Sequence, residues 1–154
     1  MKRRHLFALS ALVAATFALG ASTQAFAQKT ILKLGWTTAD SATDPYTVGA
    51  KAFKKAVEAN SKGSIEVQLY PNRQLGEEKQ VMEAVRFGTV DMTIMTNAVI
   101  AQIEPAYQVN DLPFLYSSEE QARKALDGKL GNDLSALLAK KNMIVLGHME
   151  GGFR

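Results

Sequence analysis

The stretch Tyr70–Met92, YPNRQLGEEKQVMEAVRFGTVDM, contains in order a strand end, a turn, an amphipathic helix and the start of a second strand. Pro71 and the polar residues after it favour a turn. After Gly76, apolar residues recur at helical spacing, at Val81, Met82 and Val85. Gly88 fits the position just past a helix end, where glycine is preferred. A helix that joins two strands in this way is typical of parallel sheets, so this stretch predicts a βαβ unit within a larger sheet.

The residues before this stretch predict a strand, a helix and another strand. The apolar run Ile31–Trp36 indicates a buried strand. Asp44 and Pro45 suit the cap and the first turn of a helix that we expect to end at Asn60. Ile65–Leu69 alternates apolar and polar residues, which predicts a strand with one wetter face, at or near a sheet edge.

The second half of the chain continues the alternation of strands and helices. We expect a strand at Val90–Thr96, a short helix at Ala98–Ile103, an apolar loop at Leu112–Tyr116, a helix capped by Ser117 or Ser118, a helix over Leu130–Leu138 and a strand at Met143–Leu146. This order predicts an α/β fold, a mostly parallel sheet flanked by helices. Ligands of such sheets bind outside the carboxyl ends of the strands, so the residues after each strand should share one edge.

Residues 1–27 have the pattern of a secretory signal peptide. Lys2, Arg3 and Arg4 precede an apolar run that is short for a membrane-spanning helix, and the stretch before Gln28 ends in the small-x-small pattern of a cleavage site. We therefore expect export, cleavage near Ala27 and one domain over residues 28–154. An uncleaved membrane anchor is the alternative.

Composition excludes several classes of function. The leader carries three of the eighteen Lys and Arg residues and no Asp or Glu, so residues 28–154 hold fifteen residues of each sign. A net charge near zero gives no support for nucleic acid as a partner. The chain has no Cys, no phosphate-binding glycine loop and no HExxH motif, so we expect no catalytic residue, no metal and no cofactor. We assign Glu77 and Glu78 to the first turn of their helix, where carboxylates complement the helix dipole.

Residues near the ends of the predicted strands are candidates for ligand binding. The guanidinium of Arg154 follows two glycines and can bind a carboxylate through two hydrogen bonds, although a solvated arginine would look the same in sequence. Trp36 could line a pocket or belong to the core. Thr96 and Asn97 could donate hydrogen bonds to ligand oxygens or serve only in a turn. His148 stands alone, without carboxylates at a spacing that suggests a metal or catalytic role.

Four motifs occur along residues 28–154: Tyr70-Pro71 with Gln74–Glu77, Gly88 with Asp91-Met92, Leu112–Leu115, and Gly151–Arg154. In this order and spacing they resemble the substrate-binding subunits of TRAP (tripartite ATP-independent periplasmic) transporters. Similar proteins have two α/β lobes that close over a small anion, usually an organic acid, and deliver it to a membrane permease driven by an ion gradient. The resemblance therefore implies a periplasmic binding protein, with an organic acid and a permease as its partners.

The resemblance also implies roles for single residues. In proteins like these, Arg154 would lie in the cleft close to the acid group of the ligand, and Thr37 and Thr96 would occupy ligand-facing loops. Some acid-sugar-binding relatives carry Asn and Glu at these two loop positions, so this chain departs from that subgroup. The departure argues against an acid-sugar ligand without indicating another ligand.

Family members continue for about as long again past the position of Arg154. We therefore expect residues 28–154 to form the first lobe and the start of the crossing to a second lobe, which is missing here. Capture by closure of two lobes needs both of them, so a single lobe should bind weakly and expose apolar surface. An extracytoplasmic sensory or interaction module, or a truncated remnant without function, is the alternative.

Overall fold

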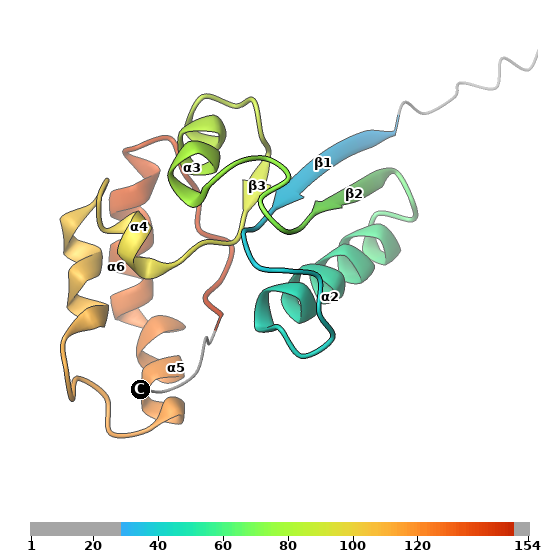
Figure 1. Ribbon diagram of the computed structural model, residues 1–154. Coiled ribbons are helices and arrows are strands. Elements are labelled where there is room, and N and C mark those ends of the chain that lie inside the picture. Colours follow the sequence, from blue (N-terminus) through green and yellow to red (C-terminus); the bar gives the residue numbers. More distant parts are fainter. Residues whose placement is uncertain (1–28, 150–154) are drawn as a thin grey trace, which may run out of the picture.

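The structure is a computed structural model that describes residues 29–149. In chain order its elements are β1 (Thr30–Gly35), α2 (Pro45–Asn60), β2 (Ile65–Tyr70), α3 (Glu78–Arg86), β3 (Met92–Thr93), α4 (Asn97–Ile100), the 3₁₀ helix η1 (Pro105–Asp111), α5 (Glu119–Leu126) and α6 (Lys129–Ala139). Figure 1 shows β1, β2 and α2 on one side of the molecule and α4, α5 and α6 on the other. The expected leader and Arg154 lie outside the described residues.

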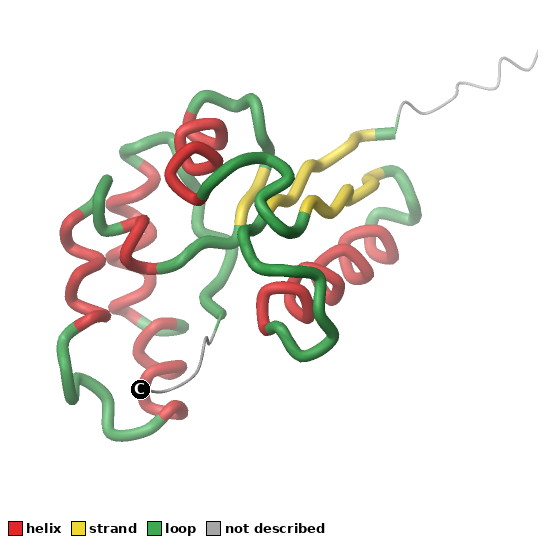
Figure 2. The backbone as a smooth tube through the Cα atoms, viewed as in Figure 1, coloured by secondary structure: helices red, strands yellow, loops and turns green. Residues whose placement is uncertain are grey.

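The three strands form one parallel sheet in the order β2-β1-β3 (Figure 2). β1 and β2 pair along their whole length, whereas β3 joins β1 only at Leu34 and Gly35. The expected α/β fold with a parallel, helix-flanked sheet is confirmed. The edge position expected for the strand that starts at Ile65 is also confirmed, since β2 borders the sheet of the described residues.

Helix ends follow the capping residues that the sequence indicates. Asp44 Oδ1 accepts a hydrogen bond from the backbone N–H of Tyr46 at 3.3 Å, one residue into α2. Of the two serines before α5, Ser118 is the cap, and its Oγ accepts from the N–H of Gln121 at 3.2 Å. Gly88 follows α3 with a φ of 74°, which glycine adopts without the steric cost of a Cβ.

Two clusters of buried side chains hold these elements together. The first lies between the sheet and α2 and consists of Leu34, Trp36, Ala50 and Val67. The second lies among α4, η1 and α6 and consists of Ala101, Tyr107, Leu134 and Leu138. Each buried Leu or Val contributes about 1.5–3 kcal/mol by leaving water, so each cluster stabilises the elements around it.

The third strand is shorter than expected. β3 spans two residues, whereas the apolar pattern predicted Val90–Thr96. One residue before β3, the carboxylate of Asp91 accepts the backbone N–H of Lys33 in β1 at 2.8 Å. The Asp91 side chain therefore accepts the hydrogen bond from Lys33 that a backbone carbonyl would accept if β3 began earlier.

The prediction of a strand at Met143–Leu146 is wrong, because residues 143–149 have no regular secondary structure. Met143 and Val145 pack against the second cluster. Ile144 and Leu146 point outward and are 83% and 69% exposed. The segment alternates like a strand, but β3, the sheet edge on that side, offers only two residues for pairing.

The region after β3 is more helical than expected. The short helix predicted at Ala98–Ile103 is α4, which begins one residue earlier and ends at Ile100. The 3₁₀ helix η1 was not predicted. It begins at Pro105, and the carboxylate of Glu104 accepts the N–H of Ala106 at 3.3 Å.

Candidate functional site at the strand-end rim

The carboxyl ends of β1 and β3 lie side by side, and one carboxylate joins the residues that follow them. Thr37, two residues past β1, donates its hydroxyl to Glu78 Oε1 at 3.2 Å. Thr96, which precedes α4, donates its hydroxyl to Glu78 Oε2 at 2.6 Å. The structure therefore brings together the two threonines that the sequence analysis placed on ligand-facing loops. We call Thr37, Glu78 and Thr96 the rim cluster.

Glu78 is the member of the rim cluster that the sequence analysis missed. It is the first residue of α3, in the first turn as predicted, whereas Glu77 precedes the helix as its N-cap residue. In the structure the two carboxylates differ in position. Glu77 pairs with Arg73 at 2.9 Å in an exposed contact, and its N–H is held by the side chain of Gln80. Glu78 is half-buried and turned toward the strand ends. Sequence spacing alone did not separate the two residues.

The surroundings of the rim cluster are electronegative. The pKa of the Tyr46 hydroxyl is raised by burial first, and then by the negative charges of Glu78 and Asp44. Asp44 also accepts hydrogen bonds from the Thr38 hydroxyl and from the N–H of Tyr46. The negative charges of Glu78 and Asp44 therefore both act on this end of α2.

Trp36 directly precedes Thr37 and belongs to the first core cluster, where it is almost fully buried. This is the core alternative of the sequence analysis. The indole Nε1 is buried and makes no hydrogen bond within the described residues. Trp36 therefore supports the strand end from which Thr37 extends.

The side chain of Asn97 is turned toward η1. Its Nδ2 donates to the carbonyl of Tyr107 at 3.0 Å and to the carboxylate of Asp111 at 2.9 Å. Its Oδ1 accepts from Asn110 Nδ2 at 3.3 Å. These contacts hold η1 against α4, so Asn97 fixes the loop that carries Thr96.

Other candidates lie away from this cluster or outside the described residues. Arg154 is outside them, and the structure gives no account of it. The ring of His148 lies against Gly131 in α6. In residues 29–149 no three His, Cys, Asp or Glu side chains gather as a metal ion would require. None of the helices in that range is long and apolar enough to cross a membrane.

The rim cluster suits neutral hydroxyl groups better than anions. A carboxylate accepts hydrogen bonds strongly, and threonine hydroxyls both donate and accept. A ligand hydroxyl can donate to Glu78 in place of a threonine. A ligand carboxylate at the same place would be repelled by the Glu78 charge, so the acid group of a ligand needs a cation elsewhere.

A parallel sheet with polar groups gathered at the carboxyl ends of its strands is the arrangement of α/β ligand-binding proteins. Residues 37–154 match the model of the family described as bacterial extracellular solute-binding protein, family 7. The chain belongs to this family, as its motifs predicted. Members of the family are periplasmic binding proteins and are not enzymes.

Similar proteins extend this identification. The 2,3-diketo-L-gulonate-binding periplasmic protein YiaO of Escherichia coli is 36% identical over 123 residues, which are 80% of this chain and 37% of that protein. The C4-dicarboxylate-binding periplasmic protein DctP of Rhodobacter capsulatus is 30% identical over 148 residues, which are 95% of this chain and 44% of that protein. The crystal structure of a TRAP periplasmic solute-binding protein from Polaromonas sp. JS666, bound to D-erythronate, matches with a TM-score of 0.72 and 34% identity, covering 77% of this chain and 39% of that one. This chain therefore spans about two fifths of the length of these relatives.

Proposed function

We propose that this chain is the first lobe of an extracytoplasmic solute-binding subunit of a TRAP transporter, which captures a small organic acid for ion-gradient-driven uptake through a membrane permease. The observation that carries the proposal is the rim cluster, in which Glu78 joins Thr37 and Thr96 at the strand ends of a chain from a solute-binding family. The relatives named above support it, because their names describe binding of a diketo sugar acid, C4-dicarboxylates and an aldonate.

In this proposal residues 1–27 are the leader that directs the chain to the periplasm, and residues 28–154 are the first lobe with the start of the crossing to a second one. Arg154 binds the carboxylate of the ligand. Thr37 and Thr96 offer hydroxyls to the rest of the ligand. Trp36 and Asn97 complete the binding set by supporting the two loops from which these threonines extend.

Glu78 narrows the proposed ligand class. A monocarboxylate with several hydroxyl groups can place its acid at a cation and its hydroxyls at Glu78. A dicarboxylate would bring a second negative charge to the same carboxylate. We therefore propose a polyhydroxy monocarboxylate rather than a dicarboxylate. Thr37 and Thr96 differ from the Asn and Glu of some acid-sugar-binding relatives, but Glu78 brings a carboxylate to the same two loops. A single lobe leaves this ligand exposed to water, so the chain of 154 residues by itself binds weakly.

The test starts from the protein purified from its native periplasm. Its intact mass shows whether the exported chain ends near Arg154 or continues into a second lobe. A panel of aldonates, uronates and C4-dicarboxylates is then compared on that species by thermal shift and calorimetry. Two variants are compared with the unmodified protein. Glu78→Gln changes the rim cluster, and the matched control Glu77→Gln makes the same substitution at the neighbouring, exposed residue.

We expect a polyhydroxy monocarboxylate to raise the melting temperature. Loss of a charged hydrogen-bond acceptor costs about 1.5–3 kcal/mol, so Glu78→Gln should weaken binding about tenfold to a hundredfold, while Glu77→Gln leaves it unchanged. Equal effects of the two variants would overturn the role of the rim cluster. If the intact mass shows a second lobe, no response to any acid would overturn the uptake function and favour the interaction module.

A further inference from the structure

The outer edge of β2 is an unpaired sheet edge within the described residues. Hydrogen bonds from Thr30 N–H to the carbonyl of Ser64 and from Trp36 N–H to the carbonyl of Tyr70 mark the side of β2 that faces β1. Backbone groups of successive strand residues point to alternate sides. The N–H and C=O groups of residues 65, 67 and 69 therefore face away from β1, where another strand could pair with them.

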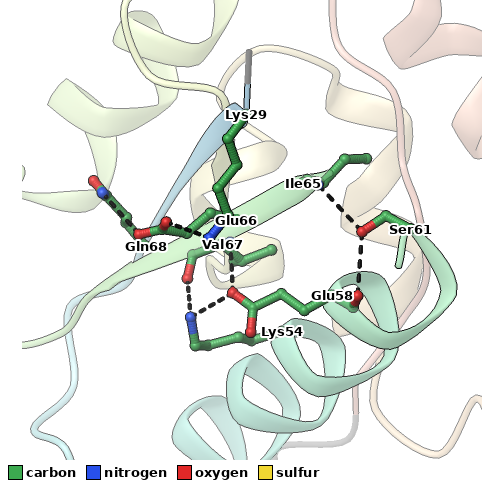
Figure 3. Close-up of polar contacts among 8 residues, drawn as sticks. All are labelled: Lys29, Lys54, Glu58, Ser61, Ile65, Glu66, Val67 and Gln68. Atoms are coloured by element: carbon green, nitrogen blue, oxygen red, sulfur yellow. Dashed lines mark hydrogen bonds and ion pairs between the residues drawn. The ribbon is translucent and has the colours of Figure 1, made fainter. Parts of the chain in front are cut away.

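Side chains from the end of α2 occupy this edge (Figure 3). Lys54 Nζ donates to the carbonyl of Val67 at 2.6 Å, and Glu58 Oε1 accepts the N–H of Val67 at 3.1 Å. Ser61 follows the helix, and its Oγ accepts a hydrogen bond from the backbone N–H of Ile65 at 3.2 Å. These three residues form what we call the edge row.

The edge row is held in place by its own contacts. Lys54 and Glu58 are one helical turn apart and form an ion pair at 2.7 Å. Their side chains are 36% and 32% exposed, whereas the ion pair Lys129–Asp133 on α6 is 88% and 61% exposed. Exposed ion pairs contribute little, but this pair also satisfies both outward-facing backbone groups of Val67. It therefore takes the place of a neighbouring strand at that residue.

We propose that the edge row prevents β2 from pairing with the β2 strand of a second copy of this chain. In an antiparallel pair centred on Val67, the two Val67 residues would exchange both of their backbone hydrogen bonds. Those bonds use the same N–H and C=O groups that Glu58 and Lys54 occupy. Glu66 of one copy would lie opposite Gln68 of the other, so no like charges would face each other. The β2 sequence is thus compatible with self-pairing, and the edge row blocks it.

The experiment uses the full chain and the double variant Lys54→Ala/Glu58→Ala. Alanine keeps α2 helical, so the change removes the edge contacts without weakening the helix. The matched control is Lys129→Ala/Asp133→Ala, which removes an ion pair of the same spacing on α6. A third variant adds Ile65→Pro to the Lys54→Ala/Glu58→Ala chain. Proline removes the outward N–H of residue 65 and is tolerated at a sheet edge, where it blocks strand addition.

Sedimentation velocity over a range of concentrations gives the average mass of each variant, and far-UV circular dichroism reports folding. We expect the double variant to approach twice the mass of the wild-type chain, the control to stay at the wild-type mass, and the added Ile65→Pro to restore that mass. A double variant that stays at the wild-type mass would overturn the proposal. Association that persists with proline at position 65 would also overturn it, because aggregation through unfolding does not depend on the β2 edge.

Discussion

Two leucines in the last part of the described chain should respond very differently to the same substitution. Leu138 is 2% exposed in the second core cluster, and Leu146 is 69% exposed. Truncating a buried leucine to alanine removes its transfer free energy and leaves a cavity, which costs about 2–5 kcal/mol. Surface substitutions stay within about 0.5 kcal/mol. We therefore expect Leu138→Ala to lower the free energy of unfolding by about 3 kcal/mol and Leu146→Ala to leave it nearly unchanged.

Urea unfolding followed by far-UV circular dichroism measures both variants. With a slope of about 2 kcal/mol per molar urea, a loss of about 3 kcal/mol lowers the midpoint by about 1.5 M. Trp36 is the single tryptophan and lies in the first cluster, so its fluorescence is a second probe of the same transition. Coincident transitions justify the conversion from midpoint to free energy. If the Leu138→Ala chain is already unfolded without urea, its free energy of unfolding has fallen by a large amount, as expected. Equal midpoints for the two variants would refute the assignment of Leu138 to the core.

Three further predictions concern a helix cap, acid stability and exposed apolar surface. Ser118→Ala should cost about 1 kcal/mol in thermal unfolding because α5 loses its cap, and Ser117→Ala should cost less because its hydroxyl is not the cap. The hydrogen bonds from Lys54 and from the Val67 amide hold the pKa of Glu58 below its ordinary value of 4.5. The stability from this carboxylate is therefore present above pH 4.5 and lost as the pH falls through the lower folded pKa, so a Glu58→Gln chain should lose less stability than wild type between pH 5 and pH 2. Ile144→Ser with Leu146→Ser should reduce the binding of a hydrophobic dye, and an unchanged dye signal would show that these side chains are covered in solution.

The sequence predicted correctly those features that depend on interactions between residues close together in the chain. The cap of α2 at Asp44 and the turn at Gly88 depend on side chains and backbone preferences within a few residues, so the sequence located them. The paired strands β1 and β2 were likewise visible as apolar and alternating runs. All three strands are parallel, as these alternations predicted, but the strand order was not predicted and β3 is shorter than its apolar pattern indicated.

Contacts between distant segments decided the remaining features. Met143–Leu146 has the pattern of a strand, but in the structure Met143 and Val145 pack against the second core cluster without pairing. Asn97 has the chemistry of a ligand contact, yet its partners lie in η1, a helix that the sequence did not reveal.

The sequence by itself determined the parallel α/β fold, the solute-binding family and the two threonines at the strand ends, because these follow from periodicity and from motifs read along the chain. Only the tertiary structure decided that Glu78 joins Thr37 to Thr96 while its neighbour Glu77 faces solvent. Glu77 is the extended residue that precedes α3 and Glu78 is the first residue of the helix, so their side chains leave the backbone in different directions. Which of the two meets the strand ends is set by how α3 packs on the sheet. The same reason applies to the edge row, where α2 meets the outer backbone groups of β2 only after both have packed on the first core cluster.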